Sequence, residues 1–242
     1  MIRLVEALNY RCLRYVSQPL DSFHVLVGPN ASGKTTFLDV IAFLGALVSD
    51  GLDAAVSERT RNFHDLLWQR QGDAFELAVE AQVPEDRRRN LSDAFDAIRY
   101  EVRIGINFDT KEVEIVEERA LLKHLKLPRQ KQLDLFPIEP QVPDSIFQPS
   151  RKGTQRILTK APGGNDNFYS EVREDSGGKG WMPSIRLGPR KSTLGNLLED
   201  ETRFPVATWF RHFLTTGVQQ FVLNSMVIRK ASPPGQPRGF KP

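Results

Sequence analysis

Nine residues from Gly28 to Thr36 place glycine, lysine and threonine at the spacing G-x-x-x-x-G-K-[ST]. Glycines let such a loop curve around an anion, so that backbone N–H groups and the positive end of the next helix face phosphate oxygens. Lys34 adds a cation and is the predicted catalytic residue, while the Thr35 hydroxyl is a predicted ligand of Mg²⁺. The loop is a Walker A motif. The predicted nucleotide contacts within it are Asn30, Ala31, Ser32, Gly33, Lys34, Thr35 and Thr36.

Such a loop needs a strand before it and a helix after it, and the sequence predicts both. Phe23 to Val27 is apolar enough to form a central strand. From Thr35 to about Val48, apolar residues cover almost every side of a helix, which predicts that this helix is buried. Because motif, strand and helix agree, a chance glycine turn is the weaker explanation.

Upstream, residues 2–16 are predicted to form a strand, a turn at Asn9-Tyr10-Arg11 and a second strand. Together with the Walker A loop, this arrangement resembles the N-terminal half of ABC-type P-loop ATPases of the SMC, RecF and OLD-like group, over about residues 1–50. The resemblance implies ATP and Mg²⁺ as ligands. It also implies that Arg11 contacts the nucleotide, with a solvated turn arginine as the alternative.

Period-two alternation follows the first helix. Residues 75–83, 100–108 and 112–116 are predicted strands, with a turn at 108–111, and they form an antiparallel meander rather than repeated strand-helix units. This argues against a small nucleotide kinase or a GTPase. The predicted fold class is α/β: an ABC-type P-loop head with a mixed sheet, an antiparallel meander lobe and a loop-rich insertion.

Three segments are predicted. Residues 1–121 form the ATPase lobe, 122–190 a basic insertion rich in proline and glycine, and 191–242 a helix from about Pro205 to Gly217 and a strand near 221–228 that lead toward a C-terminal ATPase half. The insertion suggests contact with the DNA backbone, with a solvated linker as the alternative. The candidate contacts are Lys123, Lys126, Arg129 and Lys131.

Two further motifs of this group have no convincing counterpart. Residues 175–179 resemble a signature sequence but are followed by Gly180-Trp181-Met182-Pro183, which breaks a helix. Residues 197–201 end in acidic residues without the apolar strand of a Walker B motif. A longer protein, a separate chain that supplies the other half, or a natural truncation would explain this, and we expect the first. A glutamine-loop role for Gln69 or Gln71 stays open.

Composition excludes other classes. A single cysteine, Cys12, forms no internal disulfide, and four scattered histidines give no zinc-ligand spacing. The formal net charge of +3 is only mildly basic. Without an apolar run of roughly 18–20 residues, neither a membrane span nor a signal peptide is predicted, so we expect a cytoplasmic protein and no membrane partner.

The leading functional prediction is an ATP-binding and ATP-hydrolysing head module. The resemblance implies that ATP joins two heads into a homodimer or a higher homo-oligomer. It also implies a DNA-related task, such as repair or defence against phage, with a possible nuclease partner. One alternative is a regulatory protein that senses ATP without hydrolysing it. Another is the nucleotide-binding subunit of a transporter, against which the Asn9-Tyr10-Arg11 turn argues.

Overall fold

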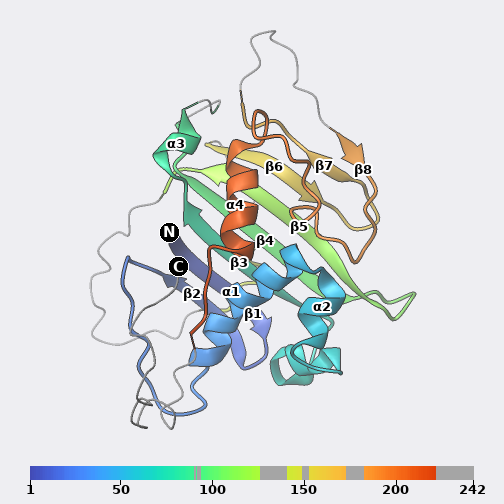
Figure 1. The fold of residues 1–242 in the computed structure, drawn as a ribbon. Coiled ribbons are helices and arrows are strands. Elements are labelled where there is room, and N and C mark those ends of the chain that lie inside the picture. The colour runs from blue at the N-terminus through green and yellow to red at the C-terminus, as the bar shows by residue number, and fades with distance from the viewer. Residues whose placement is uncertain (90, 92–93, 126–140, 149–152, 173–182, 222–242) are drawn as a thin grey trace, which may run out of the picture.

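A single antiparallel sheet of eight strands forms the body of the protein (Figure 1). The computed structural model describes residues 1–89, 91, 94–125, 141–148, 153–172 and 183–221. The strand order is β2-β1-β3-β4-β5-β6-β7-β8, and every neighbouring pair is antiparallel. The strands are β1 Ile2–Tyr10, β2 Leu13–Pro19, β3 Ala74–Gln82, β4 Ala97–Ile106, β5 Val113–Lys123, β6 Thr154–Lys160, β7 Asp166–Phe168 and β8 Ser184–Ile185.

The alternation in the sequence sets the register of the central strands. Phe75 pairs with Ile104 and Leu77 with Val102, which places these apolar side chains on one face. The predicted meander is confirmed. β5 begins where the third strand was expected and continues to Lys123, and β6 to β8 then extend the same sheet.

Helices cover one face of the sheet. The longest is α1, Lys34–Ser49, which packs beside α4, Pro205–Thr215 (Figure 1). Two short helices, α2 Leu52–Ser57 and α3 Glu85–Arg88, and two 3₁₀ turns, η1 Phe63–Leu66 and η2 Trp68–Arg70, complete the helical content of the described residues. The predicted helix after the loop is therefore confirmed, although it is not buried all round, because Leu38 is 47% exposed.

Close contact between α1 and α4 depends on a glycine. A Cβ atom at Gly45 would lie 2.8 Å from the backbone oxygen of Leu214. α4 begins with Pro205 and ends before Gly217, whose N–H donates to the carbonyl of Phe213, as the sequence predicted. Packing against α4 thus holds in place the C-terminal half of α1, which lies away from the loop.

Charged side chains occupy the opposite face of the sheet. The fully buried Arg99 forms ion pairs with Glu6, Glu80 and Glu101. Residues 141–148 cross this face, where the backbone carbonyl of Ile146 accepts a hydrogen bond from Arg99 at 2.9 Å. Every buried charge here therefore has partners, as burial in a low dielectric requires.

The expected central strand at residues 23–27 is not formed. Phe23, Val25 and Val27 are 81%, 62% and 88% exposed, and no strand pairs with this segment among the described residues. The described sheet is therefore antiparallel throughout instead of mixed. The physical reason is that a strand exists only where a neighbouring strand takes up its backbone hydrogen bonds.

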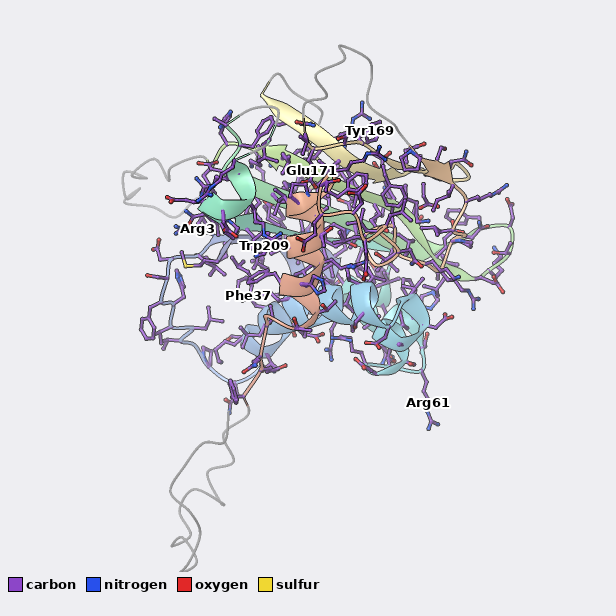
Figure 2. All side chains as sticks on the ribbon, turned by 45° about the horizontal axis from the view of Figure 1, so that its top comes forward. Arg3, Phe37, Arg61, Tyr169, Glu171 and Trp209 are labelled. Carbon is purple, nitrogen blue, oxygen red and sulfur yellow. The ribbon has the colours of Figure 1, made fainter. Side chains whose placement is uncertain are left out.

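Glu171 joins the β7 end of the sheet to α4. Its carboxylate accepts hydrogen bonds from the backbone N–H groups of Val206 and Ala207 at 2.6 and 2.8 Å, at the end where the helix begins (Figure 2). Those two bonds favour the charged carboxylate, but burial outweighs them and raises the pKa of Glu171 to about 8.

Protonation of Glu171 should therefore appear in the pH dependence of stability. The folded protein holds this proton up to about pH 8, whereas the unfolded chain loses it near the ordinary glutamate pKa of 4.5. Between these pH values the unfolded state binds fewer protons, so this group's stabilising contribution decreases as the pH rises. Thermal unfolding between pH 5 and 9 should show a larger loss of Tm in the wild type than in Glu171→Gln. Parallel profiles would contradict the raised pKa.

Candidate functional site

The Walker A loop curves at the start of α1. Gly33 caps the helix with φ 88°, and the Phe37 N–H donates to its carbonyl at 2.8 Å. A Cβ atom at Gly33 would also lie 3.1 Å from the end of the Leu13 side chain, so glycine suits both the left-handed backbone and the close approach of Leu13. No side chain caps the helix and its first turn holds no acidic residue, so its N–H groups are available to an anion.

Lys34 lies against the loop. Its ammonium donates to the carbonyls of Gly28 at 2.9 Å and Pro29 at 2.6 Å, and to Ser32 Oγ at 3.2 Å. These contacts hold the only cation of the motif within the curve of the loop. The same three donor hydrogens can turn to phosphate oxygens, which are stronger acceptors than carbonyls because they carry charge.

The other predicted contacts surround this curve. Asn30, Ala31, Ser32 and Thr35 are exposed, and Thr36 is half-buried, with its hydroxyl accepting a hydrogen bond from Cys12 Sγ at 3.2 Å. Within the described ranges, no cluster of three or more His, Cys, Asp or Glu side chains could hold a metal. Thr35 is exposed at the start of α1, so its hydroxyl is accessible, and its role as a ligand of Mg²⁺ beside phosphate oxygens stays a prediction.

Arg11 lies in the two-residue turn between β1 and β2. Its φ of 52° is left-handed, and its N–H donates to the Leu66 carbonyl at 2.8 Å. Because Cys12 contacts Thr36 and Leu13 lies against Gly33, this turn abuts the start of α1. The structure thus places the turn beside the start of α1, with the Arg11 side chain on Asp39, and contact between Arg11 and a nucleotide stays a prediction.

Asp39, which the sequence analysis did not single out, links this turn to the helix. Its carboxylate accepts hydrogen bonds from Tyr10 Oη at 2.6 Å, Arg11 Nη1 at 3.2 Å and Arg59 Nε at 2.8 Å. The pKa of Tyr10 is raised, mainly by its burial and to a smaller extent by the negative charge of Asp39. A signal was present in the sequence, since Asp39 is the only acidic residue between Lys34 and Ser49.

The predicted DNA contact at Lys123 is wrong. Its side chain is buried, and its ammonium pairs with Glu80 at 2.6 Å across the sheet. The last residue of β5 faces the charged network rather than the solvent, so it cannot contact a phosphate backbone. Lys126, Arg129 and Lys131 lie outside the described residues.

The other motif-like stretches contribute no site. Residues 175–179 lie outside the described residues, and 197–201 form no strand: Asp200 accepts a hydrogen bond from Thr202, and Glu199 pairs with Arg211. Gln69 and Gln71 lie at η2, where Gln69 has a φ of 53°. Nothing in the described contacts assigns either glutamine to a ligand.

Comparison with known proteins identifies the family of the chain. Residues 1–170 match a family described as AAA ATPase domain. No curated protein matches the sequence. No helix in the described ranges combines the length and hydropathy that a membrane span requires.

The fold of this chain also resembles a solved structure, which is described as "Structural biochemistry of ATP-driven dimerization and DNA stimulated activation of SMC ATPases". The identity is 20% and the TM-score 0.35, over 47% of this chain and 66% of that chain. The chain thus spans slightly less than two thirds of the protein that it matches.

Replacing Lys34 should weaken ATP binding. A charge-assisted hydrogen bond contributes roughly 1.5–3 kcal/mol, so Lys34→Ala should raise the Kd for ATP by about tenfold to a hundredfold. Isothermal calorimetry measures this directly, with the exposed Lys191→Ala as the matched control. Equal affinities of wild type and Lys34→Ala would show that the loop does not hold the phosphates.

Replacing Thr35 should affect the magnesium-dependent part of binding. The ratio of ATP affinities with and without Mg²⁺ should fall severalfold in Thr35→Ala, because a hydroxyl ligand is lost. Thr36→Ala serves as the control, since the Thr36 hydroxyl faces Cys12 and its removal should leave the ratio unchanged. An unchanged ratio in Thr35→Ala would exclude Thr35 as a ligand.

Proposed function

Because this chain belongs to the AAA ATPase domain family, we propose that it is an ATP-binding head module that hydrolyses ATP once a second polypeptide surface completes its site. The observation that carries the proposal is the curved loop at α1, with Gly33 in the left-handed region and Lys34 held at its centre. ATP with Mg²⁺ is the ligand that fits this donor set. Phosphoryl transfer to water is the reaction class.

Hydrolysis also needs a carboxylate or a similar group to position water. The only acidic residue of α1 is Asp39, and its oxygens already accept hydrogen bonds from Tyr10, Arg11 and Arg59. Within α1, therefore, no carboxylate is free of hydrogen bonds to position water, and we propose that another surface supplies this group. That division supports catalysis by an assembly.

Exposed apolar residues beside the loop support the same proposal. Phe23, Val25 and Val27 alternate along the segment that leads into Gly28, and all three side chains are exposed. Apolar side chains gathered in this way on a surface are typical of a contact with another protein. We propose that ATP-dependent dimerisation brings a second head to this side of the molecule.

The DNA-related task is the least specific part of the proposal. Lys123 does not support it, so repair, defence against phage and a nuclease partner rest on the resemblance to the SMC, RecF and OLD-like group. A cytoplasmic location and the division at residues 121 and 190 are likewise proposals.

A non-hydrolysing ATP sensor is the second candidate function. The observation that favours it is that Asp39, the only carboxylate of α1, already accepts hydrogen bonds on both oxygens from Tyr10, Arg11 and Arg59. A sensor would bind ATP and change its contacts without releasing phosphate. Measured turnover separates the two functions.

Light scattering on the full gene product tests the proposal. A species that contains this chain alone has a mass of 27.4 kDa, and the mass should double with ATP and Mg²⁺ but not with ADP. Lys34→Ala should stay monomeric in ATP. Phosphate release that rises with the dimer fraction would support the ATPase. An unchanged mass, with ATP bound and no phosphate released, would contradict it and favour the sensor.

A further inference from the structure

Three elements meet at the carboxylate of Asp39. Tyr10 comes from β1, Arg11 from the β1–β2 turn and Arg59 from the segment after α2, while Asp39 itself lies on α1. We infer that Asp39 and Arg59 are positioning residues that hold the Arg11 guanidinium toward the phosphate loop with its charge available. This inference rests on the proposed ATP site and assigns it two further residues.

Helix geometry places Asp39 on the side of the loop. It follows Thr35 by four residues, so both lie on one side of α1, one turn apart. Its Oδ2 atom accepts hydrogen bonds from both Tyr10 Oη and Arg11 Nη1, so the Arg11 side chain is attached to the helix that follows the loop. The backbone of the same turn is fixed by the Leu66 carbonyl.

Exposure shows which part of this contact remains free. The Arg11 side chain is 41% exposed, whereas Asp39 is 17% exposed. Only Nη1 of Arg11 contacts the carboxylate in the described bonds. The guanidinium therefore keeps exposed donors besides the one on Asp39, and our inference is that these donors meet the phosphates while the bond to Asp39 is kept.

Arg59 is a second cation that pairs with the Asp39 carboxylate. Its side chain is 9% exposed, lies over the Phe43 ring at 4.9 Å, and donates to Asp39 Oδ1 and to the Ala55 carbonyl, each at 2.8 Å. Asp39, which is 17% exposed, lies between the guanidiniums of Arg11 and Arg59. Arg59 also pairs with Glu58 at 3.3 Å, but the Glu58 side chain is 59% exposed, so solvent screens its charge more than that of Asp39. Without Arg59, Asp39 would neutralise Arg11 and weaken its attraction for phosphate.

Two possible roles of Asp39 predict opposite changes in ATP affinity for Asp39→Asn. If Asp39 were only a nearby negative charge, Asp39→Asn would tighten ATP binding by removing repulsion. If it positions Arg11, the same change releases the guanidinium and weakens binding. Because an indirect role needs Arg11, the weakening must disappear when Arg11 is already absent.

The test is a double-mutant cycle of ATP affinities in the full chain. Calorimetry with ATP and Mg²⁺ should give a Kd about three- to tenfold higher for Asp39→Asn and for Arg59→Gln. In the Arg11→Ala background, Asp39→Asn should have no weakening effect. The control is Asp53→Asn, an exposed carboxylate on α2 paired with Arg190, which should match wild type.

Each contrary result has a separate meaning. Tighter binding by Asp39→Asn, or the same loss with and without Arg11, would overturn the positioning role, since a general effect on folding would persist in both backgrounds. Failure of Lys34→Ala to change ATP affinity would instead contradict the proposed function. The two failures are therefore distinguishable.

Discussion

The site depends on the contact between the β1–β2 turn and the first turn of α1. Leu13 lies close against Gly33, and Asp39 accepts hydrogen bonds from Tyr10 and Arg11 at the same contact. α1 is buried against β1 and β3, which holds the helix and the β1–β2 turn in fixed positions relative to each other. The phosphate loop thus has its shape because a helix and a hairpin are locked together behind it.

That arrangement leaves one side of the nucleotide site open. The sheet covers α1 from behind and α4 covers part of its length, but Leu38 and the segment that leads into the loop remain exposed. Apolar surface of this kind beside a polar cradle is typical of an interface. A head that binds ATP on one surface and needs a second surface for catalysis would respond to nucleotide through assembly.

Local patterns in the sequence predicted the loop, α1 and the meander, because glycine spacing and side-chain alternation are local properties. Phe23 to Val27 has the composition of a strand, yet strand formation depends on neighbours that the pattern does not contain. Lys123 lies in a basic run, but its partner Glu80 is 43 residues away on another strand. Asp39 is visible as an isolated charge, whereas its donors Tyr10 and Arg59 are known only from the fold.

Amide hydrogen exchange at the loop would test the central claim most directly, because the account assigns phosphate binding to backbone N–H groups. With ATP and Mg²⁺, peptides covering residues 28–37 should exchange markedly more slowly than in the free protein, while peptides from β4 should not change. Unchanged exchange at 28–37 under conditions in which ATP is bound would contradict the account, because the nucleotide would then lie elsewhere.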